Sequence, residues 1–279
     1  MPWNSRRIGS VDGQRADGAA RQIEHHGTVR PDPTAHPARV VAVIQARTGS
    51  SRLPGKVLLP LAGRPVLGWV VRAALAAPGV DEVVVATSTA DGDDAVADLA
   101  ADLGVGVVRG SELDVLSRFV AARDATAADA VVRLTADCPL LDPALVGAVV
   151  GAWRADPSLD YVATTLVRTL PRGLDVELVS SDALDRADAV ARDHHRVHVT
   201  SALYAEPGAY RTLGLVVAPD AHDLRVTLDT AQDATLLEAV TAALGDAPPA
   251  WRDLVALLRS RPELVALNAE VRQKALEEA

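Results

Sequence analysis

The chain has 279 residues, of which 49% are hydrophobic, and a formal net charge of −9 at pH 7. This length can bury a substantial core, either as one α/β domain with embellishments or as two small domains. Binding to nucleic acid or to an anionic membrane needs a broad basic surface, so the negative net charge predicts neither partner. Any anion that the protein binds is expected to be small and locally held.

The single cysteine, Cys138, excludes an internal disulfide framework and fits a reducing compartment. No apolar run approaches the roughly 20 residues of a spanning helix, and the N-terminus has no apolar signal-peptide core. We therefore expect a cytoplasmic protein. Cys138 itself is expected to be a small packed residue, since the sequence shows no histidine, oriented by a third residue, that would activate it as a nucleophile.

The first 38 residues are polar and rich in Gly, Arg, Pro and His, without a sustained apolar period. Such a segment cannot bury enough apolar surface to offset the entropy of ordering, so residues 1–38 are predicted to be a disordered leader. His25, His26 and His36 lie in it, but without a rigid scaffold they do not predict a metal site.

From residue 39 onward, short runs rich in Val and Ile alternate with helical patterns. Strands are predicted at 39–46, 82–88, 105–110 and 130–137, with helices at 66–77, 94–104, 115–125 and 143–156. Apolar strands that alternate with helices predict an α/β domain over 39–279 with a doubly wound, mostly parallel, Rossmann-like sheet. The later part predicts strands at 160–165, 174–179, 210–217 and 224–229, and helices at 231–245 and 251–260.

The loop after the first predicted strand is unusual in its charge. Between residues 39 and 80 there are six basic residues and no acidic one, although the chain as a whole is acidic. Small and turn-forming residues there would let backbone N–H groups approach an anion; they are Gly49, Ser50, Ser51, Pro54 and Gly55. We predict a phosphate-binding loop, and the alternative is a solvated loop with an incidental lysine.

The lysine of this loop strengthens the prediction. Lys56 is one of two lysines among 28 basic residues, and its compact point charge suits a triphosphate together with Arg47 and Arg52. The loop is not a Walker A motif, because five residues separate Gly49 from Gly55 and no Ser or Thr follows Lys56. ATPase or kinase chemistry of that type is not expected.

Two aspartates are the last residues of predicted strands: Asp137 ends the strand at 130–137, and Asp229 ends the strand at 224–229. In open α/β sheets ligands bind beyond the carboxyl ends of the strands, so both carboxylates are expected to share a hard divalent ion such as Mg²⁺. The alternative is that Asp229, like Asp142, caps a following helix.

Three further segments contain candidate site residues. In 109–119 the candidates are Arg109, Gly110, Ser111 and Arg118, and the alternative is helix capping by Ser111 or Asp114. In 171–177 they are Arg172, Asp175 and Glu177, which would hold a polyol or lie on a solvated edge strand. His194 and His198 have a spacing compatible with metal ligation, but no HExxH pattern supports a zinc site.

Several segments stand in the order typical of one family: VIQARTGSSRLPGKVLLPLAGRPVL, VVVATS, VVRGSELDVLSRF, VVRLTADCPLLDP, GLDVE, HVT and LRVTLDT. On these segments, covering about residues 40–240, the chain resembles the cytidylyltransferases of the spore-coat-polysaccharide-biosynthesis type, which are related to CMP-sugar-acid synthetases. The sequence departs from the usual family residues at Thr48 (Met), Ala136 (Gly), Arg172 (Asp) and Val197 (a carboxylate).

The resemblance implies a nucleotide-diphospho-sugar transferase fold with a small acceptor-side β subregion. It implies that Asp137 and Asp229 hold Mg²⁺ and act in catalysis with Arg47 and Lys56. The residues implied to bind the nucleotide, in family terms CTP, are Gln45, Ala46, Arg47, Gly49, Ser50, Arg52, Lys56, Ser88, Arg109, Gly110, Ser111 and Arg118. Those implied to lie toward the acceptor are Arg172, Asp175, Glu177 and His198. Related synthetases pair through the acceptor-side segment, so a homodimer through about residues 165–215 is also expected.

The expected reaction is transfer of CMP from CTP to a sugar acid, a sugar phosphate or a related small phosphorylated acceptor, with release of pyrophosphate. One alternative is a nucleotide-sugar-dependent glycosyltransferase, although ADCP stands where such enzymes commonly present a DxD motif. Another is a nucleotide-binding protein without turnover, against which the retention of Lys56, Asp137 and Asp229 argues.

Overall fold

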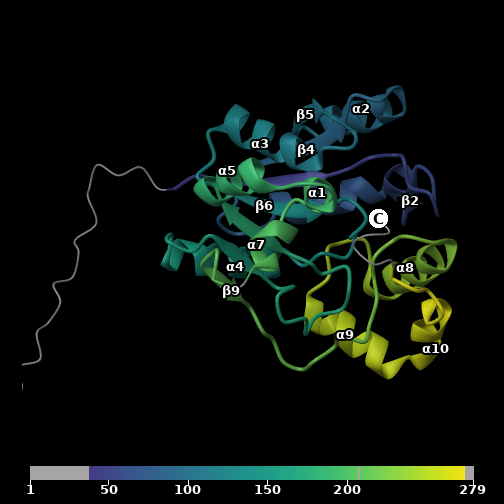
Figure 1. Cartoon of the computed structure of the whole chain (residues 1–279). Helices are drawn as coiled ribbons and strands as arrows, with labels where there is room; N and C mark the ends of the chain where they lie inside the picture. Colours follow the sequence, from purple (N-terminus) through teal and green to yellow (C-terminus); the bar gives the residue numbers. More distant parts are fainter. Residues whose placement is uncertain (1–37, 207, 274–279) are drawn as a thin grey trace, which may run out of the picture. The chain divides into compact units, whose positions relative to one another are not determined.

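The computed structural model describes residues 38–206 and 208–273. Apart from Ala38, the expected leader at 1–38 lies outside the described residues, as do His25, His26 and His36. The described part of the chain forms a seven-stranded sheet in the order β5-β4-β1-β6-β8-β7-β9, with helices on both faces (Figure 1).

Four neighbouring strands of this sheet are parallel: β5 (Gly106–Gly110), β4 (Glu82–Ser88), β1 (Val40–Gln45) and β6 (Ala130–Thr135). The next strand, β8 (Glu177–Ser180), is antiparallel to β6 and to β7 (Tyr161–Ala163), and β9 (Thr212–Gly214) is parallel to β7. A short separate hairpin pairs β2 (Pro60–Leu61) with β3 (Arg64–Pro65). The sheet is therefore mostly parallel, as predicted, with β8 as the reversed strand.

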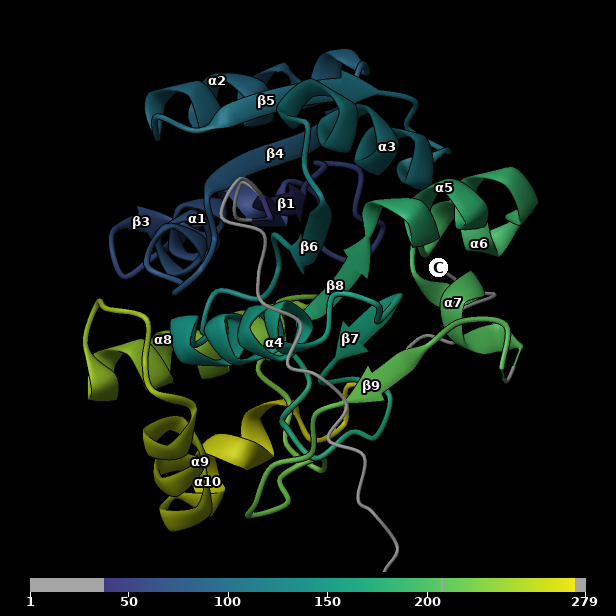
Figure 2. The same cartoon turned by 90° about the vertical axis from the view of Figure 1, so that its left-hand side faces the viewer.

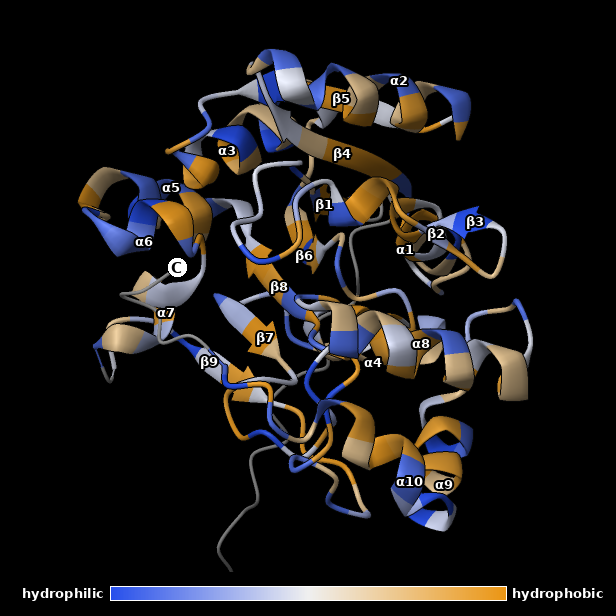
Figure 3. Ribbon diagram, turned by 90° about the vertical axis from the view of Figure 1, so that its right-hand side faces the viewer, coloured by the Kyte–Doolittle hydropathy of each residue, from blue (hydrophilic) through white to orange (hydrophobic). Residues whose placement is uncertain are grey.

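Two apolar cores lie on opposite faces of the sheet because side chains alternate along each strand. In β1, Val40, Ala42 and Ile44 face one core, whereas Val41 and Val43 face the other. The first core includes α1 (Val66–Leu75), α2 (Asp94–Asp102), α4 (Pro143–Ala155), α8 (Ala231–Leu244) and α9 (Trp251–Ser260). The second includes α3 (Val115–Thr126), α5 (Ser181–Val190) and α7 (Ser201–Ala205). Figure 2 shows α1 and α3 on opposite sides of the strands, and Figure 3 shows the apolar character of the strands between them.

Short helices complete the described chain: η1 (Lys56–Leu58), η2 (Asp91–Asp93), α6 (His194–Val197), α10 (Pro262–Val265) and η3 (Ala266–Asn268). No helix within 38–206 or 208–273 is long and apolar enough to cross a membrane.

The strand order creates a switch point at the centre of the sheet. From β1 the chain runs to β4 and β5 on one side and then returns to β6 on the other side of β1. Gln45, the last residue of β1, is in register with Thr135, the last residue of β6. The loops that follow these two strands therefore leave the sheet side by side, which is where doubly wound folds bind ligands.

The strand predicted at 224–229 is wrong. This segment makes only an isolated bridge, between Arg172 and Arg225. It crosses the end of β6 instead of joining the sheet, since the Leu228 N–H donates to the Asp137 carbonyl at 2.8 Å. A Val- and Leu-containing run thus has its backbone partners in loops, which its local pattern does not reveal.

Two of the capping alternatives are confirmed and one is wrong. Asp114 accepts from the Ser117 N–H at 3.0 Å and is the N-cap of α3, and Asp142 accepts from the Ala144 N–H at 2.7 Å and is the N-cap of α4. In contrast, the N-cap of α8 is Thr230, which forms a capping box with Asp233. Asp229 precedes this cap, so its carboxylate does not serve the helix.

Candidate functional site

A cleft of about 410 Å³ lies beyond the carboxyl ends of β1 and β6. Its lining comes from the loop after β1, the end of β6, the segment before β8, the end of α6, the 224–229 segment and the C-terminal segment. Residues that line it are Gln45, Arg47, Gly49, Ser50, Ser51, Arg52, Lys56, Val57, Arg133, Thr135, Ala136, Asp137, Cys138, Arg172, Gly173, Asp175, Val197, His198, Thr227, Asp229 and Gln273.

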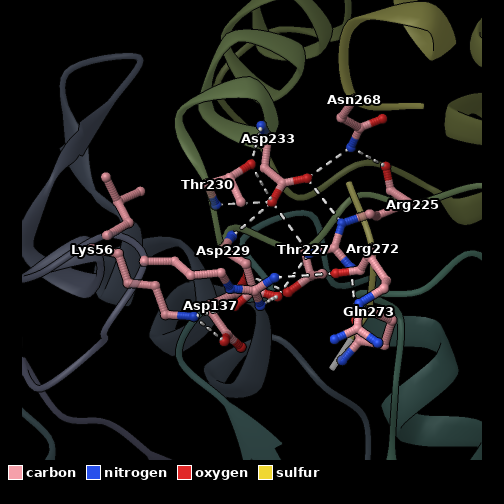
Figure 4. Close-up of polar contacts among 12 residues, drawn as sticks. Lys56, Asp137, Arg225, Thr227, Asp229, Thr230, Asp233, Asn268, Arg272 and Gln273 are labelled. Carbon is pink, nitrogen blue, oxygen red and sulfur yellow. Dashed lines mark hydrogen bonds and ion pairs between the residues drawn. The ribbon is translucent and has the colours of Figure 1, made fainter. Parts of the chain in front are cut away.

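Lys56 lies between the two predicted aspartates. Its Nζ donates to Asp137 Oδ2 and to Asp229 Oδ1, both at 2.6 Å (Figure 4). Gly55, with a φ of 68°, lets the loop turn into η1 at this point. Burial lowers the pKa of Lys56, but the two carboxylates raise it more, so that it lies above its ordinary value. The ammonium is therefore firmly protonated, although Lys56 is only 9% exposed.

Asp229 is held by three cations. Besides Lys56, its carboxylate lies 3.0 Å from Arg52 Nη2 and 2.7 Å from Arg225 Nη2. Burial raises the pKa of Asp229, but Lys56, Arg225 and Arg52 lower it by more, so that it lies at about 2. This carboxylate is thus ionised across the physiological range, which is the form that binds a hard cation.

A row of polar groups behind Asp229 fixes its orientation. Arg225 Nε donates to Asp233 Oδ1 at 2.9 Å, and Asn268 Nδ2 donates to the same oxygen at 2.8 Å (Figure 4). Asp233 is completely buried. Because Asp233 and Asn268 leave Arg225 little freedom, the guanidinium presents a fixed edge to Asp229.

Asp229 reaches Asp137 without a strand because loops hold the 224–229 segment in place. The Thr227 hydroxyl donates to the Asp137 carbonyl at 3.2 Å. On the other side, Gly173 packs against the segment with a φ of 105°, and a Cβ at that position would lie 2.6 Å from the Thr227 nitrogen. Only glycine allows this approach, which brings the loop before β8 against the segment that carries Asp229.

The donor set at this position suits Mg²⁺. Asp137 Oδ2 and Asp229 Oδ1 each lie 2.6 Å from Lys56 Nζ, so the two carboxylates are close enough together to share one cation, and the Lys56 ammonium occupies that position here. Mg²⁺ is usually held by one or two carboxylates together with substrate phosphates and water. Within the described residues, no group of three or more His, Cys, Asp or Glu side chains is arranged to hold a metal, so phosphate and water would supply the remaining ligands.

Asp93, which the sequence reasoning missed, anchors the loop after β1. Its carboxylate accepts from the Thr48 N–H at 2.7 Å and the Thr48 hydroxyl at 2.8 Å, and also from the Ser88 hydroxyl. Burial raises the pKa of Asp93, but the hydrogen bonds from Ser88 and Thr48 lower it more. A carboxylate soon after a strand end was the only signal in the sequence, and it did not distinguish Asp93 from its acidic neighbours.

Six of the residues expected near the nucleotide do not line the cleft: Ala46, Ser88, Arg109, Gly110, Ser111 and Arg118. Ser88 is buried against Asp93, and Arg109 pairs with Asp94 at 2.7 Å. Arg118 is fully buried, and its three guanidinium nitrogens have no hydrogen-bond partner within the described part of the chain. Burial, and then the charge of Arg47, lower its pKa. A buried guanidinium without protein partners is unusual.

Of the residues expected near the acceptor, Arg172, Asp175 and His198 line the cleft, but Glu177 does not. Glu177 is 5% exposed and accepts from Arg133, from the Tyr161 hydroxyl and from the Thr200 hydroxyl at 2.7 Å. The structure therefore places this carboxylate behind the cleft, where it neutralises Arg133. Arg133 lines the cleft and was missed. The sequence around a basic residue in an apolar strand does not show toward which face of the sheet its side chain points.

Comparison with known proteins decides the family. The sequence model of the cytidylyltransferases matches residues 41–242. The chain belongs to the cytidylyltransferase family. It is 34% identical over 235 residues to the spore coat polysaccharide biosynthesis protein SpsF of Bacillus subtilis, covering 80% of this chain and 95% of that protein. An uncharacterized protein of Methanocaldococcus jannaschii is 33% identical over 244 residues, covering 86% of this chain and 98% of the relative.

Solved structures agree with the fold of this cytidylyltransferase. A cytidylyltransferase from Leptospira borgpetersenii superposes with a TM-score of 0.79 at 27% identity, covering 85% of this chain and 99% of that one. A CMP:2-keto-3-deoxy-manno-octonic acid synthetase complexed with CTP superposes with a TM-score of 0.59 at 22% identity, covering 74% and 99%. The expected fold class and family resemblance are thus confirmed.

The C-terminal segment of this cytidylyltransferase lies beyond the family match yet reaches the site. Gln273 lines the cleft, and its Oε1 accepts from Arg225 Nη1 at 2.7 Å. The Arg272 carbonyl accepts from Arg52 Nη1 at 3.2 Å. Two of the three arginine and lysine partners of Asp229 therefore also contact this segment, which no sequence pattern linked to the site.

Cys138 is buried beside Asp137, and its Sγ lies 3.1 Å from the Thr135 hydroxyl. Burial raises the pKa of its thiol well above the ordinary value, and Asp137 raises it further. A buried thiol that stays protonated agrees with the expected role as a packed small residue.

Proposed function

We propose that this protein transfers CMP from CTP to a small sugar-like acceptor and releases pyrophosphate. The observation that carries the proposal is the position of Lys56 between Asp137 and Asp229 in a cleft that also contains Arg47 and Arg52. Family membership supports the choice of cytidine. So does a region of 132 residues that is 40% identical to the 3-deoxy-manno-octulosonate cytidylyltransferase of Maricaulis maris, covering 46% of this chain and 49% of that enzyme.

The basic loop would bind the triphosphate and neutralise the leaving pyrophosphate. Arg47 has no hydrogen bond or ion pair within the described residues, so its charge is available to phosphate oxygens. Arg52 and Lys56 now hold Asp229, and their charges would be shared between the carboxylate and the incoming phosphates. Fixed positive charge at the leaving group stabilises the transition state of phosphoryl and nucleotidyl transfer.

Asp137 and Asp229 would hold Mg²⁺, which supplies positive charge to the phosphates when it is bound. The acceptor oxygen would attack the α-phosphorus, and the bond from that phosphorus to the bridging oxygen of the pyrophosphate would break. The chain's contribution is mainly to align the two reactants and keep the phosphate charge neutralised. An acceptor with a phosphate nucleophile needs no general base, whereas a hydroxyl acceptor would release its proton to solvent.

The nucleoside would lie on the β1 and β4 side of the cleft, near Ser88, Arg109, Gly110, Ser111 and Arg118. The support for this placement is membership of the cytidylyltransferase family, because these residues do not line the cleft and Arg118 is fully buried. The acceptor would lie on the β8 side, near Arg172, Asp175 and His198.

We also propose a homodimer through the acceptor-side segment at about residues 165–215. Large apolar side chains exposed in or next to this segment support it: Val167, Val190, Tyr204, Leu213 and Val216. Exposed apolar side chains of this size are of the kind that a protein interface buries. Light scattering after gel filtration would give twice the chain mass if the proposal holds and the single chain mass if it does not.

The test of the activity is pyrophosphate release with each of CTP, UTP, GTP and ATP plus Mg²⁺, against sugar acids, sugar phosphates and small phosphonates. Release with CTP and one acceptor class would support the proposal. Release of UDP or GDP from a nucleotide sugar, without pyrophosphate, would indicate a glycosyltransferase instead. Binding of CTP without any product across the panel would favour a nucleotide-binding protein without turnover.

A further inference from the structure

One cation of the cleft has no counter-ion and is not needed by the triphosphate. Most cations there are matched: Lys56 pairs with both aspartates, Arg52 pairs with Asp229, and Arg133 pairs with Glu177. Arg47 and Arg172 also line the cleft. Within residues 38–206 and 208–273, the guanidinium of neither forms a hydrogen bond or an ion pair. Arg47 follows β1 in the phosphate-binding loop, which leaves the charge of Arg172 to be explained.

The backbone of Arg172 is fixed relative to the carboxylates. Its N–H donates to the Leu224 carbonyl at 2.9 Å, and its carbonyl accepts from the Val226 N–H at 2.7 Å. Gly173, which follows, is packed against the same segment. The segment that carries Asp229 thus holds the base of the Arg172 side chain in place at the wall of the cleft.

Carboxylates close to Arg172 are already used by other cations. Asp175 is bound through both oxygens by Arg168, at 2.5 and 3.0 Å. Asp229 is shared by Lys56, Arg52 and Arg225. Burial, and then the like charge of Arg168, lower the pKa of Arg172 more than the neighbouring carboxylates of Asp175 and Asp229 raise it. A partly buried guanidinium beside other arginines is electrostatically unfavourable until an anion joins it.

The position of Arg172 separates it from the triphosphate side. Along the sheet the order is β1, β6, β8, so the loop after β1 and the segment before β8 lie on opposite sides of Asp137, which follows β6. Arg47 and Arg52 are on the first side and Arg172 is on the second. An anion at Arg172 would therefore lie across the two carboxylates from the leaving pyrophosphate, where the second substrate must be.

We propose that Arg172 binds an oxyanion of the acceptor that takes no part in bond formation, so that the enzyme selects acceptors carrying a carboxylate, phosphate or phosphonate group. This inference rests on the proposed function, since it assigns the acceptor to the β8 side of the cleft. Arg172 is a specificity-determining residue, and it contributes nothing to CTP binding.

The binding test fills the triphosphate side first, using α,β-methylene-CTP and Mg²⁺, and then titrates inorganic phosphate or acetate by calorimetry. Wild-type protein should bind at least one of the two anions about tenfold or more tightly than Arg172→Gln does. Arg172→Lys should recover part of the affinity. The control, Arg261→Gln, removes an exposed charge that lies outside both the cleft and the segment at 165–215 and should leave affinity unchanged. Equal affinities in wild type and Arg172→Gln, or no binding to either, would overturn the proposal.

The kinetic test compares acceptors that differ only in the anion: a sugar acid with its sugar alcohol, a sugar phosphate with its sugar, and a hydroxyalkylphosphonate with its alcohol. Wild type should prefer the charged member of one pair, which also distinguishes carboxylate from phosphorus oxyanions. Arg172→Gln should raise KM for that acceptor about tenfold or more and leave KM for CTP unchanged. Equal use of charged and neutral acceptors by wild type would overturn the inference while leaving cytidylyl transfer intact. Failure of α,β-methylene-CTP to bind wild type at all would overturn both.

Discussion

Replacing Lys56 by Met would test the centre of the site, because it removes the ammonium and keeps most of the apolar stem. The two bonds of 2.6 Å to Asp137 and Asp229 disappear, and Asp229 retains Arg52 at 3.0 Å and Arg225 at 2.7 Å. The site would then hold two carboxylates with less positive charge between them. Both the stability of the free protein and its affinity for triphosphate should fall.

The pKa of Asp229 sets the magnitude. It falls from 3.8 to about 2, and at about 1.4 kcal/mol for each tenfold change in proton affinity this corresponds to about 2.5 kcal/mol. Lys56 is the largest of the three cations that lower it. We therefore expect Lys56→Met to lower the free energy of unfolding at pH 7 by about 1–2 kcal/mol, which leaves a typical domain folded.

This effect has a defined pH dependence. Because the pKa of Asp229 is lowered in the folded state, its contribution is complete above the unfolded value of about 4 and is lost as the pH falls through about 2. The part of the stability difference between wild type and Lys56→Met that comes from Asp229 should therefore be constant from pH 7 to about pH 5 and shrink below pH 4. Urea unfolding at a series of pH values measures it.

The same variant should bind CTP about tenfold or more weakly and lose about 100-fold or more in kcat/KM. Isothermal titration with CTP and a pyrophosphate assay give these values. Arg52→Met is the graded comparison, since Arg52 contacts only Asp229 of the two aspartates and its loss should have a smaller effect on stability. A Lys56→Met protein with wild-type affinity and turnover would refute the assignment, as would one that loses stability alone.

Three other variants test separate parts of the site. Asp137→Asn should abolish the Mg²⁺ dependence of pyrophosphate release, and an unchanged Mg²⁺ titration would exclude Asp137 as a ligand. Asp93→Ala should free the loop after β1 at Thr48 and raise KM for CTP about tenfold. Thr48→Val keeps the hydrogen bond from the backbone N–H to Asp93 and should have a smaller effect. Equal KM values in wild type and Asp93→Ala would show that the contact between Asp93 and Thr48 has no role in CTP binding. Gly173→Ala should lower the free energy of unfolding by about 2 kcal/mol or more, because its Cβ would meet the Thr227 nitrogen at 2.6 Å; an unchanged urea midpoint would contradict the observed packing.

The sequence by itself determined the features that depend on neighbouring residues. Runs of Val and Ile identified β1, β4 and β6, and the helical patterns identified α1 and α4, because burial on one or both faces imposes a short period on the chain. The charge of the loop after β1 and the rarity of lysine were also enough to identify Lys56. These signals are local, so they remain visible before folding.

Other parts of the site were decided only by the tertiary structure. Asp229 lies beside Asp137 because loop hydrogen bonds and the close approach of Gly173 hold its segment there, and no strand pattern encodes that contact. Glu177 was expected in the cleft, but it neutralises Arg133 behind it. Arg225 and Gln273 meet at the site from positions 48 residues apart. Direction, burial and pairing of a charged side chain depend on which distant segments pack around it, and packing of that kind is set by the whole fold.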